Sequence, residues 1–255
     1  MIMMNFLSRA DLKNQAKDKM TGRYFYAVML TILCSLTTMF LSSCSSLIEI
    51  QLSTSLCGLL SLEAGNLWVS GVCSLVALFF STICEIFQIG ISLFYLSAAC
   101  GRPNAPGNLF WGFHDNFKRS FIIAGILSVT GFLCFLPVQL LQRAYNAKVL
   151  TDMSLLPAGG VLQIALLIVY FYITLSLSQS YFLLLDFPQY DAWQIMKLSC
   201  KTMKGHKLRL FLLQLSFLPL ILLCIPTFGF GTLWLSPYMS MTYALFFLDI
   251  MHNNN

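Results

Sequence analysis

Long apolar runs are the feature that most constrains this chain, because each is suited to cross a lipid bilayer as a helix. A bilayer core is about 30 Å thick and a helix rises 1.5 Å per residue, so a span needs roughly 20 apolar residues. Six such stretches occur, at 24–43, 67–98, 121–141, 161–185, 208–225 and 233–250. The pattern predicts an all-α fold, a polytopic transmembrane helical bundle in which residues 1–255 form a single integral membrane domain.

The composition excludes the main soluble alternatives. Hydrophobic residues make up 58% of the chain and charged residues only 10%, whereas soluble domains carry about 25% charged residues. There is too little polar surface to cover a water-soluble globule of 255 residues. An ordinary cytosolic enzyme, a disordered chain and a nucleic-acid binder are therefore excluded, and the net charge of +5 is expected to orient helices instead.

The basic residues predict that orientation, because cytoplasmic loops of membrane proteins carry an excess of lysine and arginine. Placing the N-terminus inside leaves Arg143 and Lys148 as the basic residues outside. We therefore expect six spans with both termini cytoplasmic. The basic residues on the inner side are then Arg9, Lys13, Lys17, Lys19, Arg23, Arg102, Lys118, Arg119, Lys197, Lys201, Lys204, Lys207 and Arg209.

Two short segments predict helices that lie on the inner membrane surface, one near the N-terminus and one after the second apolar stretch. Residues 6–20 begin with Ser8 and Asp11, which have the form of a capping pair, and Gly22 ends the segment. Residues 108–118 are aromatic and lead into Lys118 and Arg119, which we expect to bind anionic headgroups.

A third surface helix is predicted at 191–204. Asp191 and Gln194 have the spacing of a capping box. Lys197, Lys201 and Lys204 are spaced four and three apart, so they share one face, while apolar residues gather on the other. This layout is typical of an interfacial helix whose basic face meets anionic lipid headgroups.

The two halves of the chain suggest a parallel internal repeat. Residues 118–137 and 207–226 each run from a lysine to a proline, and each follows a predicted surface helix. Two such copies would be related by an axis along the membrane normal. The alternative is a coincidence between two similar membrane hairpins, and the sequence leaves both open.

Polar side chains form stripes along the second and fourth apolar stretches. Spacings of three and four residues place the members of each stripe on one helix face. Hydroxyl side chains also mark the places where membrane helices pack, so a packing role is the alternative. The members are Ser70, Ser74, Ala77, Ser81, Glu85, Gln88 and Ser92 in the second stretch, and Gln163, Tyr170, Thr174, Ser178 and Tyr181 in the fourth.

Glu85 is the acidic residue that lies well inside a predicted span. An ionised carboxylate at the bilayer centre costs at least about 2.5–3.5 kcal/mol, so we expect a protonated or hydrogen-bonded side chain that faces the bundle interior. One hypothesis is a proton- or cation-responsive site, and the other is a neutral acid that bridges two helices. The candidate intramembrane polar site comprises Glu85, Gln88, Ser81, Thr174 and Tyr170.

Catalytic and metal-binding motifs are not found. The nine cysteines include no Cys-x-x-Cys pair, and no phosphate-binding glycine loop or zinc-protease motif occurs. We therefore expect no metal, no cofactor and no enzymatic activity, with His114, Asp115 and His206 as the nearest candidates for lipid chemistry. Cys44 and Cys57 fall in one predicted outer loop, where a disulfide is the alternative to two free thiols.

Several short motifs occur along nearly the whole chain. Their residues are Arg9, Leu12, Lys13, Ala16, Phe110, Gly112, Phe113, Met203, Lys204, Gly205, Phe211, Ser216, Phe217, Gly229, Gly231, Trp234, Pro237 and Tyr238. In these motifs the chain resembles an uncharacterised family of bacterial integral membrane proteins, known as a domain of unknown function. More distantly, it is similar to the membrane domain of some glycerophosphodiester phosphodiesterases, whose catalytic domain it lacks. The resemblance implies a bacterial cytoplasmic membrane location. We also expect Trp234 and Tyr238 to anchor the outer interface.

Two functional hypotheses follow. The first is a non-enzymatic scaffold or accessory subunit that binds anionic lipid and acts with a protein partner or a second copy. The alternative is a small proton- or cation-coupled transporter that uses the polar stripe around Glu85. A polar cavity reaching the membrane midplane would favour the transporter, and a dry, tightly packed bundle would favour the scaffold.

Overall fold

The computed structural model describes residues 6–60, 67–102, 110–114, 117–146, 155–187, 189–227 and 229–254. All regular secondary structure in these ranges is helical, which confirms the predicted all-α class. The contacts divide the chain into a larger unit and a smaller unit, which we describe separately. The larger comprises Met1–Thr37, Ile86–Ile123 and Leu175–Asn255, and the smaller comprises Thr38–Glu85 and Ala124–Thr174.

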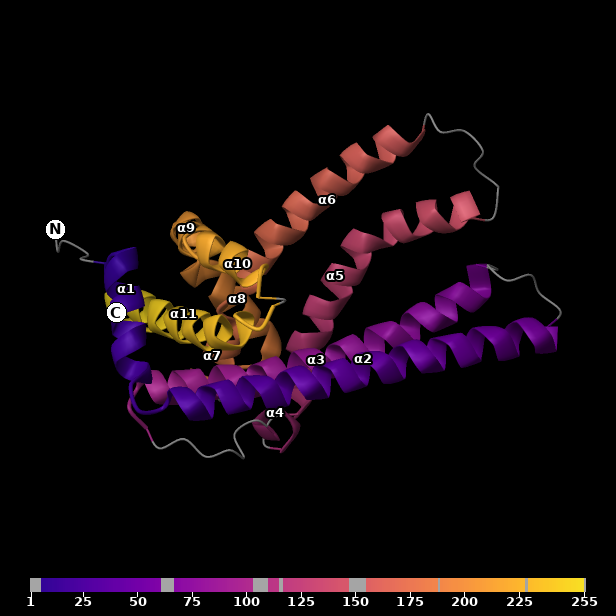
Figure 1. Ribbon diagram of the computed structural model, residues 1–255. Coiled ribbons are helices and arrows are strands. Elements are labelled where there is room, and N and C mark those ends of the chain that lie inside the picture. Colours follow the sequence, from indigo (N-terminus) through magenta and orange to yellow (C-terminus); the bar gives the residue numbers. More distant parts are fainter. Residues whose placement is uncertain are drawn as a thin grey trace. The chain divides into compact units, whose positions relative to one another are not determined.

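Two long helices, α2 (Tyr24–Leu60) and α3 (Leu67–Ala99), lie side by side (Figure 1). Helix α3 matches the predicted stretch 67–98, but α2 continues 17 residues beyond the predicted end at residue 43. In its polar second half, the hydroxyls donate to carbonyls three or four residues earlier and so find their hydrogen-bond partners within the helix. Ser43 and Thr54 bond to Met39 and Ile50 in this way, both at 2.9 Å.

The length of α2 also decides the question of the disulfide. Cys44 and Cys57 lie 13 residues apart on this one helix, which separates their Cα atoms by about 20 Å. A disulfide requires Cα atoms within about 7 Å. The helix therefore excludes a bridge between them within one chain, and the thiol of Cys44 is free. The side chain of Cys57 lies outside the described residues.

The smaller unit is built from parts of α2, α3, α5 (Phe117–Asn146) and α6 (Leu155–Leu177). The thiol of Cys73 on α3 donates to the carbonyl of Glu49 on α2. The ring of Tyr170 on α6 packs on Phe135 of α5, with centroids 5.9 Å apart. A Cβ added at Gly131 on α5 would lie 3.6 Å from the same ring, at ordinary van der Waals distance.

Five helical segments in the described ranges are long and apolar enough to cross a membrane. The chain is therefore helical and membrane-like, as the apolar runs predict. Large apolar side chains such as Phe40 and Val161 remain exposed on these segments, as expected where lipid rather than protein covers them. The segments are Tyr24–Leu56, Gly71–Ala99, Phe117–Gln139, Gly160–Asp186 and Lys207–Cys224.

The core of the larger unit is α11 (Thr232–Asn254), whose Ala244, Phe246 and Phe247 are fully buried. The N-terminal helix α1 (Arg9–Met20) packs across it (Figure 1). Ser8 and Asp11 cap α1 as predicted: the Asp11 amide donates to the Ser8 hydroxyl, and the Ser8 amide donates to the Asp11 carboxylate. The predicted surface helix thus buries its apolar face on protein.

Short helices complete the larger unit: α4 (Trp111–His114), α7 (Ser180–Asp186), α8 (Ala192–Thr202), α9 (Lys207–Leu215) and α10 (Leu218–Cys224). The predicted fourth stretch is broken between α6 and α7, and the fifth is broken between α9 and α10. The two copies of the suggested repeat therefore differ locally. Helix α5 continues through Pro137, whereas its counterpart breaks around residues 216–217.

The contacts of α1 do not fit the predicted sixth span. At one end of α11, Asp249 accepts a hydrogen bond from the Leu7 amide that leads into α1. At the other end, the Tyr24 hydroxyl just after α1 bonds to the Trp234 carbonyl. A charged surface helix cannot meet both ends of a helix that crosses a bilayer about 30 Å thick. Trp234 therefore lies beside the residues that follow α1, and its predicted role as an anchor at the outer interface stays a prediction.

Candidate functional site

Helix α8 presents the predicted lysine face outward. Its N-terminus carries the capping box predicted for Asp191 and Gln194, and the Asp191 amide donates to the Gln194 side chain at 3.1 Å. Ala192 and Ile195 are buried against the unit, and α8 packs on α7. The buried Ser199 hydroxyl donates to the Ser176 carbonyl at 2.9 Å.

This packing fixes the position of the basic side chains. Lys197, Lys201 and Lys204 are all exposed, as the helix periodicity predicts. Trp193 is 60% exposed, and the Lys197 ammonium lies 5.9 Å from its ring. Lys197, Lys201 and Trp193 thus share the outer face of α8, whose opposite side is anchored to protein, and Lys204 lies in the turn directly after the helix, which ends at Thr202 instead of the predicted residue 204. That combination suits an anionic surface.

Lys118 and Arg119, the other predicted headgroup ligands, lie in the first turn of α5. Lys118 is exposed, and Arg119 is half-buried. Phe113 of α4 stacks on Phe117 at 6.4 Å and contacts Phe87 at 5.0 Å. Lys118 and Arg119 therefore follow directly after Phe117, which is part of this aromatic cluster.

A polar cavity of about 280 Å³ lies within the larger unit. It is bounded by α3, the break between α6 and α7, α9 and α11. Nearly all of its polar groups are neutral amides and hydroxyls, so it suits an uncharged, hydrogen-bonding molecule or water. The polar lining residues are Gln88, Ser92, Tyr95, Ser178, Gln179, Tyr181, Gln214, Ser240 and Tyr243.

Gln179 is the most distinctive group of this cavity. Its side chain is 1% exposed and donates to the Ser178 hydroxyl at 3.1 Å. Its Oε1 atom has no hydrogen-bond partner among the described residues. A buried acceptor without a partner costs roughly 1–3 kcal/mol, so a donor from water or a ligand would be favourable here.

The structure brings together only part of the predicted polar site. Gln88 and Ser92 of the second-stretch stripe line the cavity, as do Ser178 and Tyr181 of the fourth. Glu85 is half-buried and is not among the lining residues. Residues of both stripes therefore line the same cavity at one end of α3. Glu85, the carboxylate for which the polar site was predicted, is not part of this lining.

The remaining predicted members of the polar site bond or pack locally. The Ser81 hydroxyl donates to the Leu78 carbonyl at 3.0 Å, and the Thr174 hydroxyl donates to the Tyr170 carbonyl at 2.8 Å. Both Ser81 and Thr174 are exposed, and the Tyr170 ring packs in the smaller unit. Tyr170 therefore fits the packing alternative, whereas the role of Ser81 and Thr174 in a polar site stays a prediction.

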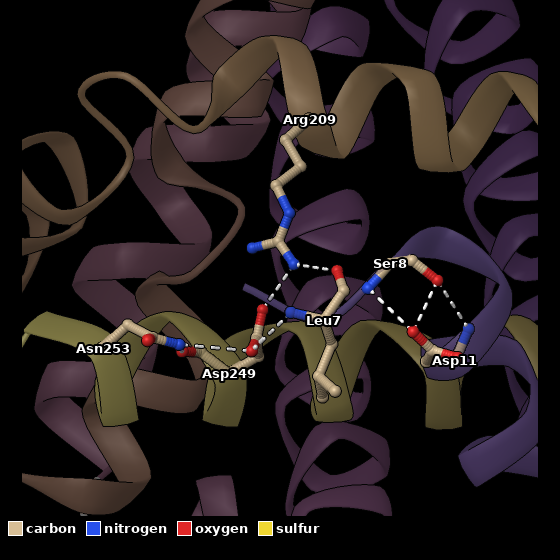
Figure 2. Close-up of polar contacts among 6 residues, drawn as sticks. All are labelled: Leu7, Ser8, Asp11, Arg209, Asp249 and Asn253. Carbon is tan, nitrogen blue, oxygen red and sulfur yellow. Dashed lines mark hydrogen bonds and ion pairs between the residues drawn. The ribbon is translucent and has the colours of Figure 1, made fainter. Parts of the chain in front are cut away.

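An ion pair not predicted from the sequence joins the N-terminus to the C-terminal helix (Figure 2). The Arg209 guanidinium contacts the Asp249 carboxylate at 2.5 Å and donates to the Leu7 carbonyl at 2.6 Å. Asp249 in turn accepts from the Leu7 amide at 3.2 Å and from Asn253 at 3.3 Å. The backbone amide and the backbone carbonyl of Leu7 are therefore both bound by the Arg209–Asp249 ion pair.

The surroundings of this ion pair are partly apolar. The guanidinium lies 4.8 Å from the Phe6 ring and 5.3 Å from the Phe246 ring. His206 meets Phe6 edge to face at 4.9 Å, and burial together with the Arg209 charge lowers its pKa below 6.5. His206 thus packs on Phe6 within this cluster. The side chains of His114 and Asp115 lie outside the described residues, and no metal-binding group of His, Cys, Asp and Glu occurs within the described ones.

Comparison with known proteins points to one family. A family model described as Protein of unknown function (DUF975) matches residues 3–254. No curated protein and no solved structure matches the chain.

Proposed function

Because the chain belongs to the family of proteins of unknown function DUF975, we propose its function from the site alone. The proposal is a non-enzymatic, multi-pass membrane protein of the bacterial cytoplasmic membrane that binds anionic lipid at its inner surface. It acts as a scaffold or accessory subunit for a protein partner or a second copy. The observation that carries it is the anchored helix α8 with its outward lysine face.

The reason is energetic as well as geometric. A free amphipathic helix must both fold and bind when it meets a membrane, whereas α8 is already folded and held by its buried face. Each lysine near an anionic surface contributes about 1 kcal/mol. Because Lys197 and Lys201 share one face of α8 and Lys204 lies in the turn directly after it, we expect the three lysines to meet the same patch of headgroups at once.

Neutralising this face is expected to abolish the preference for anionic lipid. A protein that keeps Trp193 as its sole tryptophan is reconstituted into vesicles that contain brominated phosphatidylglycerol or brominated phosphatidylcholine. Stronger quenching by phosphatidylglycerol is expected, and Lys197→Gln, Lys201→Gln and Lys204→Gln together should weaken that preference by roughly two orders of magnitude. The matched triple substitution to arginine should keep it. Equal quenching by the two lipids in the parent protein would refute the proposal.

A second candidate function, passage of a small solute, is favoured by the polar cavity. We infer an uncharged solute, because the polar lining consists of amides and hydroxyls. This differs from the proton- or cation-coupled path through Glu85, since Glu85 is not part of the described lining.

The test of this candidate is glycerol flux into proteoliposomes, followed by light scattering. Gln179→Leu removes the partnerless acceptor and is expected to lower glycerol permeability about tenfold, since one buried hydrogen bond to a solute is worth roughly 1–1.5 kcal/mol. Gln189→Leu, at an exposed position, is the matched control and should leave permeability unchanged. Permeability equal to that of protein-free vesicles would exclude glycerol-like solutes as the cargo.

A further inference from the structure

An open pocket of about 570 Å³ lies between α1 and the hairpin of α10 and α11. All of its lining residues belong to the larger unit. Lys13 and Lys17 form one wall, and the others are formed mainly by leucines and aromatic rings. The pocket thus combines two cations with an extended apolar surface, although in the sequence Lys13 stands out only as a motif residue and Lys17 only as one of the basic residues on the inner side.

The two lysines lie four residues apart on α1 and so share one face. The Lys13 ammonium donates to the Ser216 carbonyl at 2.8 Å and lies 4.2 Å from the Phe217 ring. These contacts fix its position and use only part of its three donors. Lys17 is exposed, and its ammonium lies 6.0 Å from the Tyr238 ring. Burial and the charges of Arg9 and Lys17 lower the pKa of Lys13, a cost that a bound anion would relieve.

The apolar wall is formed by exposed side chains. Leu223 is 66% exposed, Trp234 is 55% exposed and Leu220 is 38% exposed. The turn between α10 and α11 keeps this wall close to the lysines, because the Gly231 amide donates to the Thr227 hydroxyl at 3.1 Å. A Cβ on Gly231 would lie 2.7 Å from the Cys224 sulfur, so the close turn depends on this glycine.

We propose that this pocket binds one anionic phospholipid. The phosphate lies at Lys13 and Lys17, and an acyl chain lies along Leu220, Leu223 and Trp234. The inference rests on the proposed lipid binding for the class of ligand and deepens it by assigning a discrete site on other helices. The charges of Lys13 and Lys17 favour an anionic headgroup, and the exposed apolar wall favours an acyl chain.

The test uses a protein that keeps Trp234 as its sole tryptophan, with Trp68, Trp111 and Trp193 replaced by phenylalanine. In vesicles, brominated phosphatidylglycerol should quench Trp234 more strongly than brominated phosphatidylcholine. Lys17→Gln should weaken this preference about fivefold, and Lys17→Arg should retain it. Lys17 is the position of choice because Lys13 also holds α1 in place. Equal quenching by both lipids, or no effect of Lys17→Gln, would overturn the proposal.

Competition identifies the ligand and separates this site from α8. Unbrominated phosphatidylglycerol should relieve the quenching, and inorganic phosphate should not. Relief by oleate as effective as that by phosphatidylglycerol would replace the phospholipid with a fatty acid and overturn the assignment. The triple glutamine variant of α8 should leave quenching of Trp234 unchanged, and Lys17→Gln should leave quenching of Trp193 unchanged. Loss of both signals in either variant would show a general charge effect and refute a discrete site.

Discussion

Replacing Asp249 with asparagine is expected to release the N-terminal helix from the protein. The Asp249 side chain is 4% exposed and is the acidic partner of Arg209. Asparagine keeps its shape but leaves the guanidinium without a counter-charge, and the Nη1 atom of Arg209 already has no partner among the described residues. Breaking a buried pair in this way costs about 3–5 kcal/mol. A lower melting temperature in detergent and faster trypsin cleavage within 9–19 are the measurements.

Two further variants make this result specific. Asp186→Asn removes an exposed acid and should change stability by no more than about 0.5 kcal/mol. Arg209→Met combined with Asp249→Leu removes both charges, so it should be less destabilising than Asp249→Asn alone. An Asp249→Asn protein as stable and as resistant to trypsin as the parent would show that the ion pair does not hold α1.

The helical class and several helix ends could be predicted from the sequence because they depend on local chemistry. The capping residues Ser8 and Asp191 begin α1 and α8 where the pattern placed them. The end of α2 could not be predicted in this way. Its serines and threonines suggested a loop, yet in the helix their hydroxyls donate to the carbonyls four residues earlier. Serine and threonine occur both in loops and in helices of this kind, so composition alone does not distinguish a loop from a helix here.

The candidate sites show the same division between local and long-range information. The lysine face of α8 follows from helix periodicity alone. The Arg209–Asp249 pair joins residues 40 apart, and the Lys13–Ser216 bond joins residues 203 apart. The sequence does contain a hint of this ion pair, because Arg209 and Asp249 each lie near the end of a predicted apolar stretch. Their pairing, however, depends on how α9 and α11 pack.

The contacts of α1 link these observations. A helix with several exposed charges lies against both ends of α11, so this side of the hairpin faces water or headgroups rather than acyl chains. The exposed leucines of α10 require the opposite environment. We propose that this hairpin lies at the membrane surface, since that position would meet both requirements and would bring the lysine pocket to the depth of the lipid phosphates.

Replacing Gly112 with valine is expected to detach α4 from α3. A Cβ at this position would lie 2.8 Å from the Ile86 Cγ2 atom and 3.3 Å from the Ile86 carbonyl oxygen. The methyl group could rotate, but the carbonyl belongs to the α3 backbone and cannot yield without distorting that helix. Overpacking of this kind costs about 1–3 kcal/mol, and the branched side chain of valine favours the upper end. This contact also gives a physical reason for the glycine in the motif Phe110-x-Gly112-Phe113.

The matched control is Gly71→Val, on α3 of the smaller unit, where an added Cβ meets nothing within 4 Å. Glycine in a helix interior is unfavourable, so valine at position 71 should be neutral or slightly stabilising. Thermal unfolding in detergent should show a clear loss for the Gly112 variant and none for the Gly71 variant. Hydrogen exchange should rise around 110–114, because the rings of Phe110 and Phe113 that pack on Phe87 would separate from it. Equal stability of the two variants would mean that α4 does not pack closely on α3.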